Sequence, residues 1–75
     1  MSKFIKIECL NGRVVYLNPD NITAVEDDGN SPVFTIYTNG LDVGKSFLYF
    51  VIQGSASDFI QRLGTDYLFS IKALN

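Results

Sequence analysis

Residues 4–17 read FIKIECLNGRVVYL, and they place Asn11-Gly12 between two runs rich in β-branched and aromatic residues. A second pair, Asn39-Gly40, stands between the strand-like runs Val33 to Thr38 and Phe47 to Ile52. A type I′ turn requires positive φ at both central residues, and Asn-Gly meets that requirement at the lowest steric cost. The sequence therefore predicts two β-hairpins in a chain of 75 residues.

The register of the first hairpin follows from its turn. A two-residue turn at Asn11-Gly12 would place Cys9 opposite Val14 and Ile7 opposite Tyr16, with Cys9 as a small core residue. The expected apolar face of the hairpin then comprises Ile5, Ile7, Cys9, Val14 and Tyr16. The same register leaves Val15 and Leu17 beside Lys6 and Glu8, so either the second strand is covered on both faces or the register contains a bulge.

Further strands are expected after the breaker cluster at residues 18–21, where Pro19 lacks an amide hydrogen. Ile22 to Val25 is predicted as a third strand. In the fourth, Val33 to Thr38, Phe34 and Ile36 share one face, while the other face has Val33, Thr35 and Tyr37. After Asn39-Gly40 the chain returns through residues 41–52, which Gly44 is expected to bend or bulge.

One amphipathic helix is expected from Ala56 to Leu63. Ser55 is a good N-cap, Asp58 is a favourable charge near the helix N-terminus, and Gly64 is the expected C′ residue. The apolar side chains fall at helical spacing and form one stripe, which comprises Ala56, Phe59, Ile60 and Leu63.

The tail has strand periodicity, because Tyr67, Phe69, Ile71 and Ala73 alternate with other residues. Its partner is fixed by no turn signal, and it could pair with its own sheet or with another chain. The whole sequence, residues 1–75, predicts a single α+β domain that is mostly β. We expect a twisted antiparallel sheet or small barrel of five to six strands, with one short helix near the C-terminus.

Charge and hydropathy restrict the possible partners. The net charge is −2, and the six basic residues are scattered, whereas nucleic-acid-binding domains usually carry a clustered basic surface. Nucleic acid is therefore disfavoured. The longest uncharged apolar run, Phe47 to Ile52, is too short for a membrane-spanning helix, so no membrane association is expected. With one cysteine and no export signal after Met1, we expect a cytoplasmic protein.

Few residues could carry chemistry. The chain has no histidine, and Cys9 alone provides neither an internal disulfide nor a metal site. Gly44-Lys45-Ser46 lacks the earlier glycine and the following helix of a phosphate-binding loop. Glu26-Asp27-Asp28 lacks the ligand spacing of a calcium loop, and a solvated turn is the simpler interpretation. We expect no catalytic residue, no cofactor and no metal, and a protein that is not an enzyme.

Aromatic strand residues are the strongest candidates for a binding site. Every position from Phe47 to Ile52 is apolar, so both faces of that strand need cover, and one short helix covers only one. Either the tail covers the other face within the chain, or these segments form a subunit or partner interface. The second interpretation assigns six residues to the interface: Phe47, Tyr49, Phe50, Tyr67, Phe69 and Ile71.

A longer pattern, which covers about Phe4 to Leu63, suggests a family. The segments Leu10-Asn11-Gly12, Tyr16-Leu17-Asn18 and Ile22-Thr23-Ala24-Val25-Glu26 resemble the small flagellar and swarming-motility proteins. Thr38-Asn39-Gly40 and Val51-Ile52-Gln53-Gly54-Ser55 resemble that family's second turn and the start of its final helix. The resemblance implies a small β domain with a regulatory or structural role and no catalytic residues. The chain departs from the pattern in its longer second hairpin and in residues 66–75.

These observations predict a non-enzymatic binding protein, bacterial or phage, that self-associates, most simply as a dimer, and whose protein partner is not specified. Small domains without disulfides or metals often gain stability from oligomerisation. One alternative is a phage-type or regulatory oligomer that holds a small ligand, such as a nucleotide, at a subunit interface. A third class, single-stranded nucleic-acid binding by aromatic stacking, would show steep salt dependence.

Overall fold

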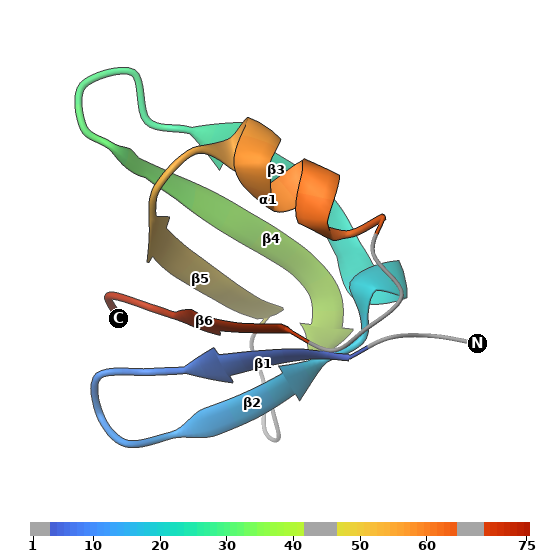
Figure 1. Ribbon diagram of the computed structural model, residues 1–75. Coiled ribbons are helices and arrows are strands. Elements are labelled where there is room, and N and C mark those ends of the chain that lie inside the picture. The colour runs from blue at the N-terminus through green and yellow to red at the C-terminus, as the bar shows by residue number, and fades with distance from the viewer. Residues whose placement is uncertain (1–3, 42–46, 65–68) are drawn as a thin grey trace.

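The computed structural model describes residues 4–41, 47–64 and 69–75. Within these residues the chain forms two three-stranded sheets, one α-helix and a single 3-10 turn (Figure 1). The first sheet has the order β2-β1-β6, and the second has the order β3-β4-β5. The predicted class, α+β and mostly β with one short helix, is confirmed. The strands, however, are divided between two sheets.

The first hairpin joins β1 (Ile5–Glu8) to β2 (Val14–Leu17). Its register places Ile7 opposite Val15 and Ile5 opposite Leu17, one residue away from the register of a two-residue turn. The Gly12 amide donates to the Cys9 carbonyl at 3.1 Å, and Gly12 has φ +89°. The loop is thus a three-residue turn whose last residue, glycine, has positive φ.

This register corrects the predicted apolar face. Val15 and Leu17 face the core with Ile5 and Ile7, whereas Val14 and Tyr16 are exposed. A shift of one residue turns every side chain of a strand to the opposite face, so the extra loop residue accounts for the whole change. Cys9 lies partly buried against the core.

The second sheet contains β3 (Ile22–Asp27), β4 (Val33–Leu41) and β5 (Phe47–Gln53), all antiparallel. A 3-10 turn, η1 (Pro19–Asn21), leads into β3. Asn39-Gly40 was predicted as a turn but lies within β4, where the register shifts between Tyr37 and Leu41. Glycine suits the backbone of a β-bulge as well as that of a tight turn, so Asn39-Gly40 did not by itself specify a turn. The connection to β5, with Gly44, lies outside the described residues.

The helix α1 (Ala56–Arg62) begins after Ser55, whose side-chain oxygen accepts a hydrogen bond from the Ser57 amide. Ala56 and Phe59 are buried, as predicted. Ile60 was predicted in the same stripe but is 53% exposed, because the helix packs through Ala56 and Phe59 and turns that position outward. Gly64 follows the helix without the left-handed φ expected of a C′ glycine.

The tail forms β6 (Phe69–Lys72), which pairs in parallel with β1 of the same chain. Beyond β6, Ala73 bridges Ile52 of β5, so the C-terminal residues join the two sheets (Figure 1). The inner faces of both sheets and α1 enclose one hydrophobic core, which consists of Ile5, Ile7, Leu17, Phe34, Ile36, Phe50, Ile52, Ala56, Phe59, Phe69 and Ala73.

Candidate interaction surfaces

Of the six residues predicted at an interface, the four whose side chains the structure describes do not gather on one surface. Phe50 and Phe69 are 2% and 8% exposed and belong to the core of the chain itself. Ile71 is partly buried against that core, and Tyr49 is 55% exposed. Tyr67 and the side chain of Phe47 lie outside the described residues. Of the predicted set, Tyr49 is therefore the described side chain most available to a second molecule.

Tyr49 lies on the outer face of the second sheet, opposite the face that α1 and the core cover. Pairs across the strands place Tyr49 beside Tyr37, Tyr37 beside Ala24, and Val51 beside Thr35. Tyr37 is 40% exposed, and none of the described elements covers it. The outer face is defined by Ala24, Glu26, Thr35, Tyr37, Tyr49 and Val51. Tyr37 was not predicted as a site residue from the sequence. The available signal was that Tyr37 lies on the strand face opposite that of Phe34 and Ile36.

The hydroxyl of Tyr37 donates a hydrogen bond to Glu26 Oε1 at 3.0 Å across the outer face. The hydrogen bond to the Glu26 carboxylate stabilises the protonated hydroxyl, and the negative charge of Glu26 would repel the phenolate. Both effects raise the pKa of Tyr37 above its ordinary value of 10.0. The proximity of Tyr49 adds to the rise. Tyr37 is thus neutral near pH 7 and held in a fixed orientation beside Tyr49.

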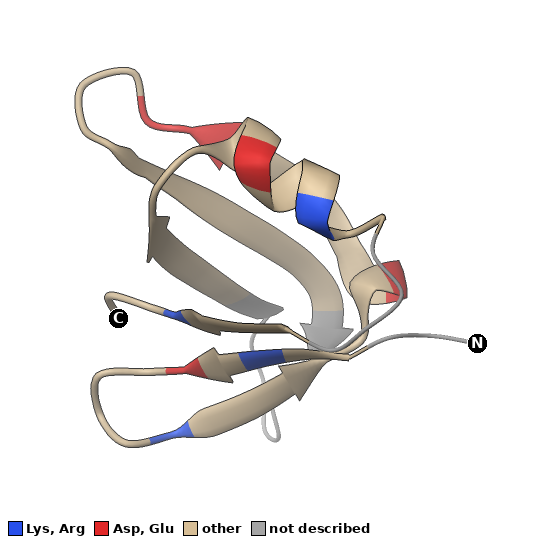
Figure 2. Cartoon of the chain, in the orientation of Figure 1, with Lys and Arg blue, Asp and Glu red and all other residues tan. Residues whose placement is uncertain are grey.

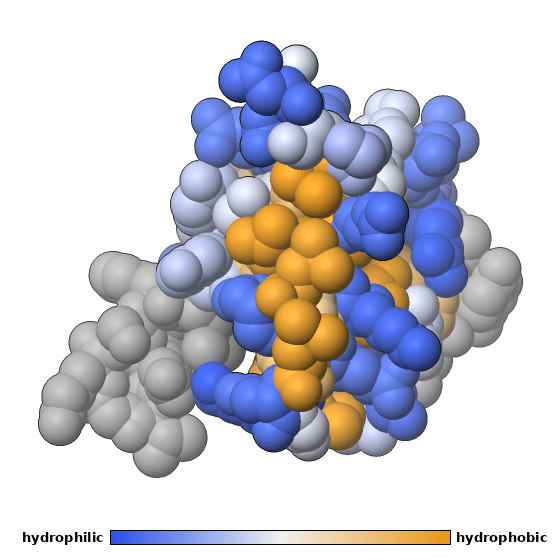
Figure 3. Space-filling view, turned by 90° about the vertical axis from the view of Figure 1, so that its left-hand side faces the viewer, coloured by the Kyte–Doolittle hydropathy of each residue, from blue (hydrophilic) through white to orange (hydrophobic). Residues whose placement is uncertain are grey.

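The outer face continues past β5 onto the C-terminal residues. The Leu74 amide donates to the Val51 carbonyl at 2.7 Å, and Leu74 is 44% exposed. The Leu10 amide donates to the Asn75 carbonyl at 3.2 Å, and Leu10 is 75% exposed. Figure 3, which views the side where the C-terminus lies, shows a continuous column of hydrophobic residues bordered by hydrophilic ones. Exposed apolar side chains therefore cross the junction between the two sheets.

Asn75 closes the edge of β5 at this junction. Its side-chain Oδ1 accepts from the Val51 amide at 3.2 Å, and its Nδ2 donates to the Tyr49 carbonyl at 3.1 Å. One side-chain amide thus takes the place of a strand residue and bonds the backbone of both residues. The arrangement fixes the backbone under Tyr49 and Val51.

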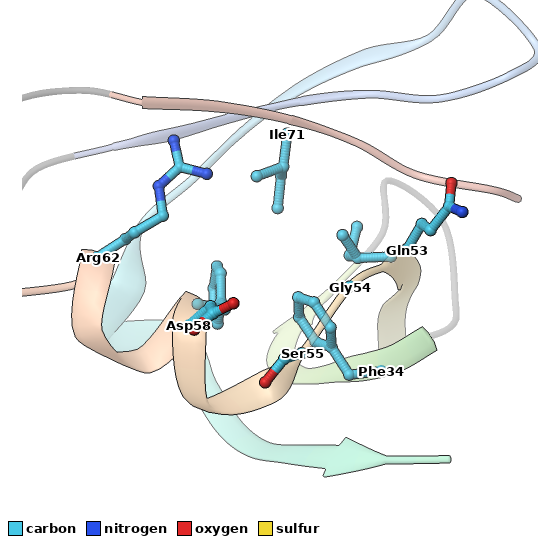
Figure 4. A pocket seen from close by; sticks show the side chains of 9 residues that line it. Phe34, Gln53, Gly54, Ser55, Asp58, Arg62 and Ile71 are labelled. Carbon is cyan, nitrogen blue, oxygen red and sulfur yellow. The ribbon is translucent and has the colours of Figure 1, made fainter. Parts of the chain in front are cut away.

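A groove lies between β6 and α1. One cavity of about 200 Å³ is walled by Phe34, Ile52 and Phe59, with Ser55, Asp58 and Arg62 from the helix side and Ile71 from β6. Figure 4 shows Ile71 on β6 opposite Asp58 and Arg62 on α1. An adjoining cavity of about 410 Å³ shares Ile52, Arg62 and Ile71 with the first and follows β6 from Ser70 to Leu74. Arg62 lies over the Phe69 ring, 4.3 Å from its centroid.

The acidic residues at the end of β3 and in the turn that follows form hydrogen bonds within the chain. Asp27 Oδ1 accepts from the Ala56 amide at 3.0 Å and so caps α1, and Asp28 Oδ1 accepts from the Asn30 amide at 2.9 Å. Among the described residues, no three histidine, cysteine, aspartate or glutamate side chains are grouped to hold a metal ion. Gly44-Lys45-Ser46 lies outside those residues.

Comparison with known proteins adds no relative. No protein-family model, curated protein or solved structure matches the chain. The resemblance to small motility proteins therefore stays a prediction. In the described part of the chain, no helix has the length and apolar character needed to cross a membrane.

Proposed function

We propose that the chain is a non-enzymatic interaction protein that pairs with a second copy of itself through the outer face and the adjoining C-terminal residues. The observation that carries this proposal is the pair of exposed tyrosines, Tyr37 and Tyr49, side by side on a sheet face. Tyrosine is enriched at protein interfaces because it buries a large ring while its hydroxyl keeps a polar partner.

Symmetry and the extent of the exposed apolar surface support a second copy as the occupant. In a two-fold dimer the same surface patch of each subunit contacts the other, so every favourable contact occurs twice. Hydrogen bonds along the backbone place the exposed side chains of Leu74 and Leu10 next to the outer face, beyond Val51, which brings a larger area within reach of one partner. A stable interface of at least about 1,000 Å² in total then becomes attainable for a small domain.

The experiment compares two tyrosines of equal exposure on different sheets. Tyr49 is 55% exposed on the outer face, and Tyr16 is 56% exposed on β2. Light scattering on the wild-type chain over a concentration series should give a dimer mass. Tyr49→Asp should raise the dimer dissociation constant at least tenfold, because the two-fold axis brings two unpaired carboxylates into the interface.

Tyr16→Asp adds the same charge away from the outer face and should leave the dissociation constant unchanged. A monomer mass for the wild-type chain at high micromolar concentration would refute the proposal. Equal effects of the two substitutions would also refute it, because they would place the contact elsewhere or make it a general effect of charge.

A further inference from the structure

A second surface, which adjoins the extended outer face at Leu10 and Leu74, has the features of a peptide-binding site. We propose that the groove between β6 and α1 binds a short extended segment of a partner protein, which adds as a strand to the edge of β6. The bound segment places one bulky apolar side chain in the cavity and an acidic side chain near Arg62. The proposal does not depend on self-association.

Within the part of the chain that the structure describes, one edge of β6 has backbone groups that are free to pair with another strand. The Ala73 amide donates to Glu8 of β1, whereas the Leu74 amide donates to Val51 of β5. Backbone groups of alternate strand residues point to opposite edges, so those of Ser70 and Lys72 point away from β1, toward the groove. In the described chain β6 pairs only with β1, apart from the single bridge at Ala73. Such an edge is a template for one more strand.

The turn at Gly54 explains why the edge is open. β5 runs beside the C-terminal residues as far as Ile52, and the chain then turns away into α1 at Gly54, whose φ is +128°. The groove occupies the space beside Ser70 and Ile71 that β5 would fill if it continued as a strand. A guest segment therefore continues the line of β5 and needs no more residues than the four of β6.

The cavity provides the side-chain specificity. Its apolar wall consists of Phe34, Ile52 and Phe59, each of which is no more than 4% exposed. About 200 Å³ is below the range of roughly 300–1,000 Å³ typical of small-molecule sites, and it suits a single bulky side chain. Strand addition combines main-chain hydrogen bonds with pockets for alternate side chains, and both are present here.

Charge favours an acidic guest. Arg62 and Lys72 line the cavity that follows β6, where the described lining residues include no acidic side chain, whereas Asp58 lines the adjoining smaller cavity. Figure 2 shows basic residues on β1, β6 and the end of α1, and acidic residues at the end of β1, on η1, near the start of α1 and at the end of β3. Glu8 lies opposite Lys72 in the pairing of β1 with β6, so Arg62 is the cation on which the charge argument rests. Arg62 is held over the Phe69 ring, which keeps its guanidinium at the rim, where it can donate to a carboxylate.

The test uses a defined probe, the fluorescein-labelled peptide Glu-Val-Phe-Val-Glu, and the full chain. Fluorescence polarisation should detect binding, with affinity lost when the central residue is glycine and reduced at least tenfold when both glutamates are lysine. Arg62→Glu should weaken binding of the acidic probe and strengthen binding of the lysine probe. Arg13→Glu, which makes the same charge change in the first hairpin, should do neither.

Two variants at one position test strand addition itself. Ser70→Pro removes the amide that faces the groove, and it should abolish binding, whereas Ser70→Ala keeps the amide and should bind as the wild type does. If Ser70→Pro does not fold, a probe N-methylated at alternate amides makes the same test on the wild-type chain. No binding at millimolar protein, or equal binding by the methylated and unmethylated probes, would overturn the proposal.

Discussion

Gly12 shows how one residue sets the packing of a hairpin. Its φ of +89° is accessible to glycine at little cost, and an added Cβ would meet no atom within 4 Å. The constraint at this position is therefore the backbone conformation alone. It fixes the three-residue loop, and the loop determines that Val15 and Leu17, instead of Val14 and Tyr16, face the core.

Substitution of this glycine tests the turn. Gly12→Val should lower the free energy of unfolding by about 1 kcal/mol or more, because a β-branched residue is strained at positive φ. Gly29→Val is the matched control: Gly29 also has open space around it but lacks a left-handed φ. Urea denaturation should separate the two variants, and equal losses would contradict the assigned turn.

The Tyr37–Glu26 hydrogen bond makes a prediction about pH. Because the folded state raises the pKa of Tyr37, the stabilisation from this bond is present below pH 10 and is lost as the pH rises through the raised pKa. A titration of the Tyr37 ring by NMR should give a pKa above its ordinary value. Glu26→Gln should lower that pKa, because it removes the negative charge. An unchanged titration in the variant would contradict the assigned cause.

The secondary-structure elements that depend on interactions between residues close in the sequence were predicted well from local sequence patterns. The third, fourth and fifth strands and the N-cap at Ser55 all lie within a few residues of their predicted positions. Two errors concern the Asn-Gly pairs: the first turn has three residues, and Asn39-Gly40 lies within β4, because Asn-Gly by itself specifies neither the length of a loop nor the position of a turn. The partner of the tail could not be predicted, because the parallel pairing of β6 with β1 joins opposite ends of the chain.

The candidate surfaces were predicted less well than the strands. Tyr49 is exposed, but Phe50 and Phe69 belong to the core, and the exposed side chains of Tyr37, Leu10 and Leu74 were not considered. Alternation separates the two faces of a strand without saying which of them the helix and the other sheet cover. That choice depends on contacts between distant segments, such as the ring contact between Phe34 and Phe59, whose centroids are 5.4 Å apart.

Neighbouring residues of α1 test its packing. Phe59 is 3% exposed, and Phe59→Ala should lower the free energy of unfolding by about 3 kcal/mol, as expected for a buried aromatic side chain. Ile60→Ala on the exposed side should cost about 1 kcal/mol or less. Thermal melts of both variants give the comparison. A melting temperature for Phe59→Ala close to that of the wild type would contradict the packed helix.

At the scale of the whole molecule, the C-terminal residues hold the two sheets together. Ala73 bridges Ile52, and Asn75 bonds the backbone at Tyr49, Val51 and Leu10. Asn75→Ala removes the two side-chain hydrogen bonds and should cost about 1 kcal/mol. Hydrogen exchange at the Val51 amide should also become faster. Asn30→Ala, in an exposed connection, is the control and should leave exchange at Val51 unchanged.

The same junction bears on the central claim, because it fixes the backbone beneath the outer face. The most direct test is an NMR sample that mixes isotope-labelled and unlabelled copies of the chain, filtered for contacts between different molecules. We predict intermolecular contacts from the rings of Tyr37 and Tyr49 and the methyl groups of Leu74. The absence of intermolecular contacts at concentrations where light scattering gives a dimer mass, or contacts confined to Val14 and Tyr16 of β2, would contradict this prediction.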